Sequence, residues 1–115
     1  MAHAPDIFPP DYATGIGQVR LLIPDTEQLE NPADLTADAE YIFDDHQIQA
    51  FLSMSNNSNK RAAAEAKMVL AASETLISKV IRTDDLQTDG AKLGAELRAQ
   101  ARELRAQAVE EETYD

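Results

Sequence analysis

The chain has 115 residues, a length that corresponds to one domain. Its 21 acidic and 10 basic residues give a formal charge of −11, so its surface as a whole should repel nucleic acid and anionic membranes. The absence of cysteine excludes disulfide bonds, cysteine ligands to zinc and thiol nucleophiles. The longest apolar runs fall far below the roughly 18 residues of a membrane span, and we expect no secretion signal at the N-terminus.

The negative charge is unevenly distributed along the chain. Residues 1–45 contain ten acidic side chains and one basic side chain, Arg20, whereas residues 60–105 contain nine basic and seven acidic ones. The acids of the first part either solvate loops or meet the more basic part of a neighbouring copy. The sequence leaves both interpretations open.

Residues 1–14 are predicted to form an extended arm. Three prolines remove backbone donors and prevent regular hydrogen bonding, so neither a helix nor a strand is expected. The spaced apolar side chains Ile7, Phe8 and Tyr12 could dock on a partner, although a frayed terminus fits the same sequence.

A short helix is predicted over residues 15–23, where Pro24 ends it. Its apolar residues recur at helical intervals, although Val19–Ile23 also fits a buried strand. The next residues, 24–43, form a long loop, in which Asn31–Asp34 has the cap, proline and acid of a single helical turn.

The start of a second helix has a clear signature. Asp44 and Gln47 stand three residues apart, as in a capping box. Phe43 and Ile48 occupy the two positions of a hydrophobic staple across that start. The helix should end at Ser55–Asn59, a turn composed of residues that hydrogen-bond their own backbone.

One long helix is predicted from about Asn59 to Arg82. A broad apolar arc on one side would form its core face, with only Ser73 interrupting the arc. Small residues on the opposite side would let a second helix approach closely, so we expect this helix to be covered twice, once by its own chain and once by another copy. Alanine is also a good helix former on a solvated face, which is the alternative explanation. This small-residue ridge consists of Ala64, Met68, Ala71 and Thr75.

The last helix is predicted over about residues 91–110. One narrow apolar stripe suits packing on a single partner helix. Its members are Leu93, Leu97, Ala101, Leu104 and Ala108. On another face Arg98, Arg102 and Arg105 cluster, where they either pair with carboxylates of a neighbouring copy or are solvated.

These elements together predict an all-α protein. We expect a small helical bundle with one long central helix, a C-terminal helix and an extended N-terminal arm. The expected organisation is an arm at 1–14, a helical domain at 15–110 and an acidic tail at 111–115.

No pattern in the sequence indicates catalysis or a cofactor. Asp44–His46 lies at a helix start, where capping explains the carboxylates better than metal binding does. The acids of residues 25–30 lack the spacing of a calcium loop, and Gly15-x-Gly17 is only a fragment of a phosphate-binding loop. The serines have no plausible general base nearby in sequence. We therefore expect neither an enzyme nor a bound cofactor or metal.

Three segments of the chain follow one another in a recognisable order. They are Gly17–Thr26, then Phe43–Leu52 before the Ala-rich helix, and then Ser78–Gly90 before a helix with Leu-Arg-Ala-Gln at 97–100 and 104–107. This order resembles the head–tail connector (adaptor) proteins of long-tailed phages, especially those that infect actinobacteria. The resemblance covers about residues 15–110. Its third segment is the most specific, because helix chemistry alone does not demand that loop. The proline-bearing arm departs from the usual short start.

The resemblance implies a structural protein of the virion, made in the host cytoplasm, that forms a ring of usually twelve copies beneath the portal protein. Such a ring joins the portal to the stopper or head-completion ring. It also continues the channel through which DNA passes without specific binding, and it involves no membrane.

Three sets of contacts are hypothesised from this resemblance. Neighbouring copies would meet through Ala64, Met68, Ala71, Thr75, Arg98, Arg102 and Arg105. The portal would be bound by Leu104, Ala108, Val109 and Tyr114, together with the acidic tail. The next ring would be met by Phe8, Tyr12, Asp84, Asp85 and Leu86, or by the loop at 25–41.

A second interpretation comes from another class of protein. An acidic helical regulator, such as an antitoxin or a DNA mimic, would bind a basic partner protein one to one and would show no ring symmetry.

Overall fold

The computed structural model describes residues 6–30, 36, 38–83 and 90–113. The first helix, α1 (Gly15–Leu22), begins at Thr14, whose hydroxyl accepts a hydrogen bond of 3.1 Å from the Gly17 N–H. This side-chain acceptor satisfies a donor that the first turn leaves free, so the helix rather than the alternative strand forms here. The predicted short helix is confirmed.

The second helix, α2 (Asp45–Met54), begins with the predicted capping box. The Gln47 N–H donates to Asp44 Oδ1 over 2.7 Å, and the Asp44 N–H donates to Gln47 Oε1 over 2.9 Å. Beyond the helix end, Asn56 and Asn57 adopt left-handed backbone conformations with φ of 53° and 63°. Asparagine tolerates this region well, which explains why the chain turns here.

The predicted long helix over residues 59–82 is wrong, because the chain forms two helices there. They are α3 (Asn59–Ala72) and α4 (Glu74–Thr83), and Ser73 between them is extended with φ −107° and ψ 111°. The Ser73 hydroxyl accepts a hydrogen bond of 3.2 Å from the Leu76 N–H, so it caps the new helix. A serine that can bond its own backbone competes with helix continuation.

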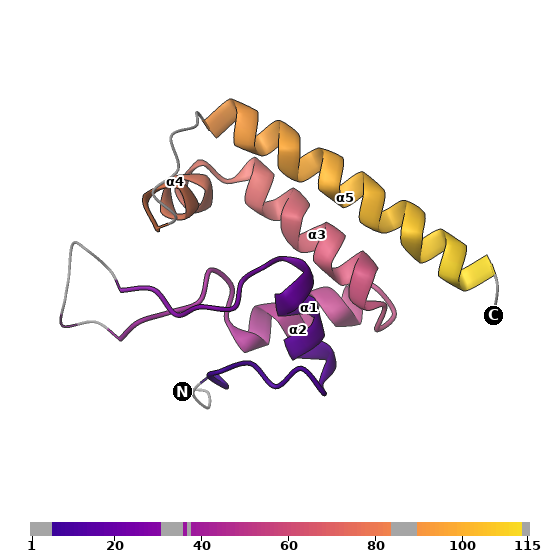
Figure 1. Ribbon diagram of the computed structural model, residues 1–115, viewed down its shortest axis with the longest axis horizontal. Coiled ribbons are helices and arrows are strands. Elements are labelled where there is room, and N and C mark those ends of the chain that lie inside the picture. The colour runs from indigo at the N-terminus through magenta and orange to yellow at the C-terminus, as the bar shows by residue number, and fades with distance from the viewer. Residues whose placement is uncertain (1–5, 31–35, 37, 84–89, 114–115) are drawn as a thin grey trace.

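The last helix, α5 (Gly90–Thr113), runs antiparallel to α3, as Figure 1 shows. The Arg61–Glu112 and Lys67–Gln100 contacts fix this direction, because low residue numbers of α3 meet high numbers of α5. The predicted C-terminal helix is confirmed and extends a few residues beyond the expected ends. With 24 residues, α5 is the longest of the five helices among the described residues.

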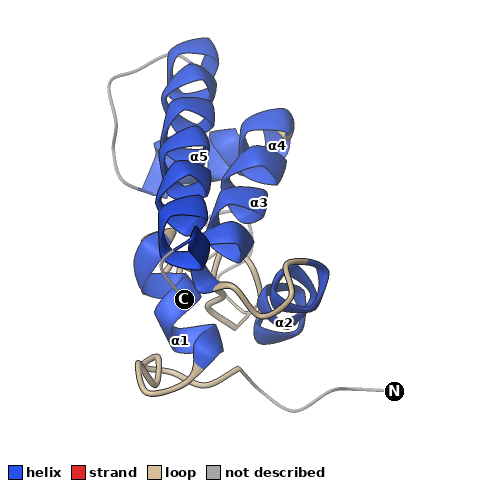
Figure 2. Ribbon diagram, turned by 90° about the vertical axis from the view of Figure 1, so that its right-hand side faces the viewer, coloured by secondary structure: helices blue, strands red, loops and turns tan. Residues whose placement is uncertain are grey.

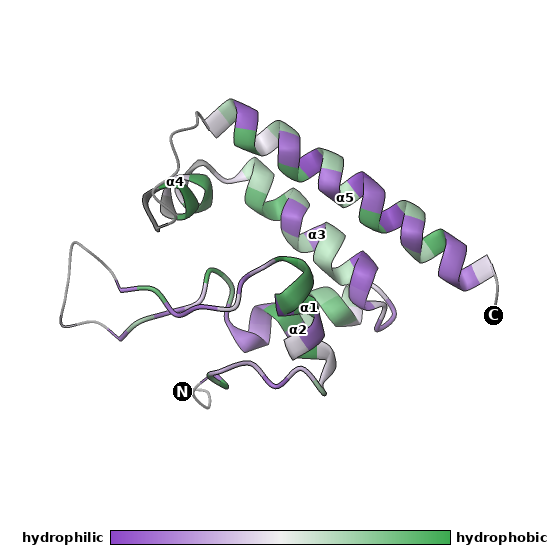
Figure 3. Ribbon diagram, viewed as in Figure 1, coloured by the Kyte–Doolittle hydropathy of each residue, from purple (hydrophilic) through white to green (hydrophobic). Residues whose placement is uncertain are grey.

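Helix α3 forms the middle layer of the fold. Helices α1 and α2 contact one part of it and α5 lies along another, while α4 crosses the end of the α3–α5 pair (Figures 1 and 2). Figure 3 shows hydrophobic residues concentrated on α1 and along α3, whereas hydrophilic and hydrophobic residues alternate on α5. The core contains Val19, Ile23, Phe43, Ile48, Phe51, Leu52, Ala62, Ala63, Ala66, Leu70, Ala71, Ile77, Leu93 and Leu97.

The described part of the chain contains helices and no strand, which confirms the all-α prediction (Figure 2). One isolated antiparallel bridge joins Leu29 and Glu40 and holds the two sides of the loop before α2 together. Within the described residues, no helix is long and apolar enough to cross a membrane. The predicted turn at Asn31–Asp34 lies outside the described residues, as do Asp84, Asp85, Leu86 and Tyr114.

Candidate functional site

A buried arginine occupies the centre of the N-terminal half. Arg20 is 1% exposed, and it forms ion pairs of 3.0 Å with Asp25 and 2.7 Å with Asp45. Its guanidinium carbon also lies 3.5 Å from the centroid of the Tyr41 ring. Two carboxylates and an aromatic face thus compensate the cost of burying this charge.

Asp25 joins α1 to the start of α2. Its carboxylate accepts hydrogen bonds of 2.8 Å from the N–H groups of Ile42 and Phe43, besides the bond from Arg20. Asp25 is only 2% exposed, so these hydrogen bonds take the place of those that its carboxylate makes to water in the unfolded chain. The loop over residues 25–43 therefore leaves and returns to the same point of the helical body.

The N-terminal arm docks onto this centre. The Ile7 N–H donates to Asp45 Oδ2 over 3.0 Å, and the Tyr41 hydroxyl donates to the Ile7 carbonyl over 2.6 Å. Asp6 accepts a hydrogen bond of 2.9 Å from the Asp45 N–H at the start of α2. Phe8 meets the Tyr41 ring edge to face, at 5.9 Å between centroids. The described part of the arm, residues 6–14, thus lies against its own chain.

Burial raises the pKa of Tyr41 above its ordinary value, and the nearby positive charge of Arg20 opposes that rise. The Tyr41 hydroxyl is therefore kept protonated and able to donate to the arm. Only a weak sign of this centre is visible in the sequence: in residues 1–45, Arg20 is the single base among ten acids, and it lies inside a predicted helix.

The small-residue ridge is covered by the chain's own α5. Ala64 is fully buried and Ala71 is 7% exposed, and a Cβ added at Gly94 of α5 would lie 3.6 Å from the Ala71 carbonyl oxygen. The prediction that Ala64 and Ala71 face another copy is therefore wrong, because α5 takes that place. Met68 is half-buried, and Thr75 is exposed on α4 beyond the break.

Polar side chains flank the α3–α5 contact on both sides. Lys60 pairs with Glu111 over 2.6 Å, and Arg61 makes two bonds of 2.7 and 2.8 Å to Glu112. The hydrogen bond between Arg61 and Glu112 raises the pKa of Arg61 and lowers the pKa of Glu112. These pairs are exposed and individually weak.

One basic side chain at the same contact is buried. The Lys67 ammonium donates to Gln100 Oε1 over 2.5 Å, and no carboxylate forms an ion pair with it in the described part of the chain. Its burial lowers the pKa of Lys67, because the charged form loses hydration.

The three arginines of α5 do not act as one group. Arg105 forms an ion pair of 2.7 Å with Glu65 of the same chain. Arg98 and Arg102 are exposed, and neither has an ion pair among the described residues. Of the three arginines of α5, Arg98 and Arg102 are therefore the two whose guanidinium groups remain available to a partner.

The residues predicted to meet other proteins differ in accessibility. Ala108 is 1% exposed, so its assignment to a portal contact is wrong: it packs inside the chain. Leu104 is half-buried against the core, whereas Val109 is 51% exposed near the end of α5. Phe8 and Tyr12 of the arm keep about half of their surface exposed.

A polar cleft of about 480 Å³ lies between the α2–α3 turn and the end of α5. Its charged lining residues are Arg61, Glu65, Arg105 and Glu112, which already pair with one another. No group of three or more potential metal ligands occurs among the described residues. Asp45, which the sequence placed beside His46, is engaged by Arg20 and Ile7.

Comparison of the chain with protein-family models found no match. Neither a curated protein nor a solved structure matched it.

Proposed function

We propose that the protein is a structural connector of a phage neck, which forms a ring beneath the portal and joins it to the stopper or head-completion ring. In this function the chain carries out no chemistry, and it belongs to the assembled virion. DNA passes through the ring without specific binding, an expectation that the charge of −11 supports because an acidic wall repels phosphates.

The observation that carries the proposal is the interlocking of two segments on which the resemblance rests. Arg20 and Asp25 belong to Gly17–Thr26, and they bind Asp45 and the backbone of Phe43 in the second segment. These segments therefore build one buried centre. A resemblance that includes such a centre concerns the fold and not scattered surface positions, which supports a shared architecture.

The exposed residues near the end of α5 support a contact with the portal. Val109 is 51% exposed, so its side chain is accessible to a partner at this end of the helix. The expected portal contact is therefore narrower than the sequence suggested, and it excludes the buried Ala108.

Co-sedimentation with the portal protein encoded in the same genome tests the function. The chain should bind that portal in a ring and should ignore the portal of an unrelated phage. Val109→Asp should weaken binding, whereas Ala99→Asp, at another exposed position of α5, should leave it unchanged. Failure to bind the portal at every salt concentration would overturn the proposal. A one-to-one complex with a basic enzyme would instead establish the regulatory interpretation.

A further inference from the structure

A regular stripe of exposed residues runs along the side of α5 that does not contact α3. Its members recur every three or four positions and therefore share one side of the helix. They are Ala91, Ala95, Arg98, Arg102 and Ala106, and every one is exposed. We call this surface the outer stripe.

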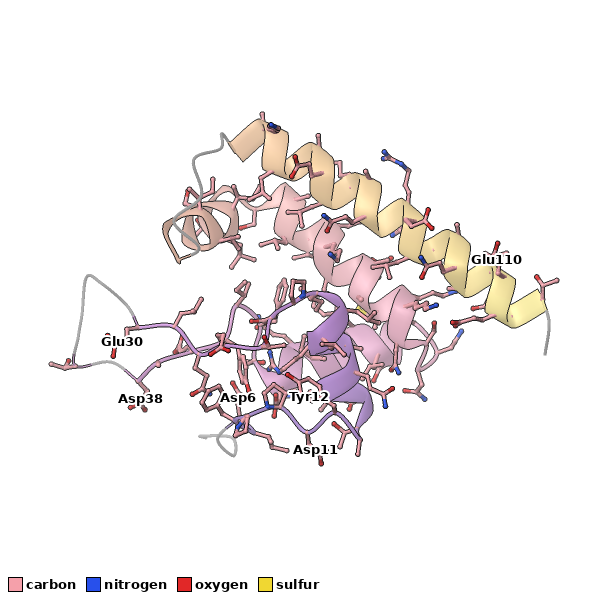
Figure 4. All side chains as sticks on the ribbon, viewed as in Figure 1. Asp6, Asp11, Tyr12, Glu30, Asp38 and Glu110 are labelled. Carbon is pink, nitrogen blue, oxygen red and sulfur yellow. The ribbon has the colours of Figure 1, made fainter. Side chains whose placement is uncertain are left out.

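The outer stripe carries positive charge that no described residue of its own chain pairs with. Arg98 and Arg102 have no ion pair among the described residues, and no acid belongs to the stripe. The other exposed flank of α5 differs, because it carries Glu96, Glu103 and Glu110. Figure 4 labels Glu110, whose side chain projects away from α3. The alanines beside the arginines leave room for the backbone of a partner to approach.

A second surface carries the opposite charge. The acidic projection, residues 26–30 and 38–40, holds four acids and no base. These acids are Glu27, Glu30, Asp38 and Glu40, each of them exposed and none with an ion pair in the described part of the chain.

The base of the acidic projection is held in a fixed shape. The Leu29 N–H donates to the Glu40 carbonyl over 2.7 Å, and the Glu40 N–H donates to the Leu29 carbonyl over 2.9 Å. In Figure 4, Glu30 and Asp38 lie at the outer part of the projection, away from the helices. The acids are thus presented on an ordered base and not on a free coil.

We propose that the outer stripe of one copy docks against the acidic projection of the next copy. The two surfaces have opposite charge, and neither has an ion pair within the residues that the structure describes. They also lie at different edges of the molecule: α5 runs along one edge, while the projection extends from another (Figure 1). One chain therefore does not join its own two surfaces, and a head-to-tail contact between successive copies, as in a ring, brings them together.

This inference rests on the proposed connector function and specifies how the copies meet. It assigns the loop before α2 to the neighbouring copy, whereas the sequence left that loop among the candidates for the next ring. Single exposed ion pairs are weak, so the contact gains its strength from repetition around a closed ring.

Charge reversal on each surface provides the test. One variant carries Arg98→Glu and Arg102→Glu, and a second carries Glu27→Arg, Glu30→Arg and Asp38→Arg, so that the acidic projection becomes net positive. All five positions are exposed, so circular dichroism and thermal unfolding should match those of the original chain. Glu96→Arg, on the other flank of α5, is the matched control.

The measured quantity is the amount of full-length chain bound per portal, by native mass spectrometry and sedimentation. Each reversed variant alone should require a roughly tenfold higher concentration to complete the ring, because like charges then meet at every contact. An equimolar mixture should recover normal assembly with the two variants alternating, since every contact again joins opposite charges. The Glu96→Arg control should assemble normally.

The outcomes separate this inference from the function on which it rests. If the original chain builds rings on the portal and either reversed variant does so equally well alone, the docking contact is overturned and the connector function stands. A mixture that fails to recover also overturns the contact. If the original chain never joins the portal, the function fails and the contact fails with it.

Discussion

Asp25 lies 3.0 Å from Arg20, and both side chains are about 1% exposed. The same carboxylate receives the N–H groups of Ile42 and Phe43, so one acid ends a loop, neutralises a buried cation and orients the start of α2. The described arm is attached to the same centre through Asp45 and Tyr41.

Replacement of this acid should therefore destabilise the whole N-terminal half. Asp25→Asn should lower the free energy of unfolding by about 3 kcal/mol, because Arg20 loses a buried counter-charge and the NH2 group that replaces one carboxylate oxygen leaves the Ile42 or the Phe43 N–H without an acceptor. Urea unfolding followed by circular dichroism measures the effect. Asp38→Asn, at an exposed position, should change stability by less than about 0.5 kcal/mol. Equal unfolding midpoints for the two variants would contradict the role of Asp25.

The arm crosses α1 at a glycine. A Cβ added at Gly17 would lie 1.9 Å from the Asp11 carbonyl oxygen, whereas one at Gly15 would lie 3.4 Å from Leu52 Cδ1, which a flexible side chain can accommodate. Gly17→Ala should cost about 2 kcal/mol and displace the arm, because two backbones cannot separate without losing contacts. Limited proteolysis should then cleave the arm faster. Gly15→Ala should leave both stability and cleavage nearly unchanged, and similar behaviour of the two variants would be evidence against this crossing.

The break between α3 and α4 depends on a cap. Ser73→Ala removes the acceptor of the Leu76 N–H and should cost about 1 kcal/mol of stability, again measured by urea unfolding. Ser78→Ala, at an exposed position inside α4, is the control. It should be neutral or slightly stabilising, since alanine is the better helix former there. A Ser73→Ala variant as stable as the original chain would show that packing alone sets the break.

Lys67 should be a site where removal of a charge stabilises the protein. Lys67→Met keeps an unbranched side chain at a buried position and removes the cost of burying an ammonium group, which should raise the free energy of unfolding by about 1 kcal/mol at neutral pH. Lys60→Met is the matched control on the same helix. It should bring no gain, because Lys60 is partly exposed and already paired with Glu111.

The gain from Lys67→Met should depend on pH. The pKa of Lys67 is lower in the folded chain than in the unfolded chain, so the folded chain binds fewer protons and its stability rises with pH over that interval. The penalty is thus largest below the folded pKa and shrinks as the pH approaches the ordinary value of 10.5. Unfolding curves at increasing pH should converge for the two chains, and a constant difference would contradict the burial of a charged Lys67.

The features predicted correctly from the sequence are local ones. The capping box at Asp44 and the turn at Asn56 and Asn57 depend on residues within a few positions of each other, so their spacing alone was informative. By its hydrophobic pattern, Ser73 is only a small interruption of a continuous apolar arc. In the structure, the Ser73 hydroxyl caps α4, and the helix breaks at this residue. Hydrophobic periodicity does not show how strongly a serine side chain competes for the hydrogen bonds of the backbone.

The errors at the candidate sites have a different cause. The ridge at Ala64 and Ala71 does accept a closely packed helix, but sequence periodicity cannot tell whether that helix belongs to the same chain. Likewise, Arg20 pairs with Asp45, which is 25 positions away in the sequence, and Arg105 pairs with Glu65, which is 40 positions away. The packing of the helices determines which acids lie beside each arginine. The sequence of one helix alone therefore does not show whether its arginines are exposed.

The charges at the open end of the α3–α5 pair are arranged against the dipole of each helix. Lys60 and Arg61 stand at the positive start of α3, and Glu111 and Glu112 stand at the negative end of α5. Each helix end would therefore be weakened in isolation, and only the antiparallel pairing at this one alignment gives every charge a partner. A slip by one turn, or a parallel arrangement, would leave both sets of charges opposed by their own helices. The unfavourable ends thus favour one register for two alanine-rich helices whose small, similar side chains discriminate poorly between alternatives, alongside the Lys67–Gln100 and Glu65–Arg105 contacts.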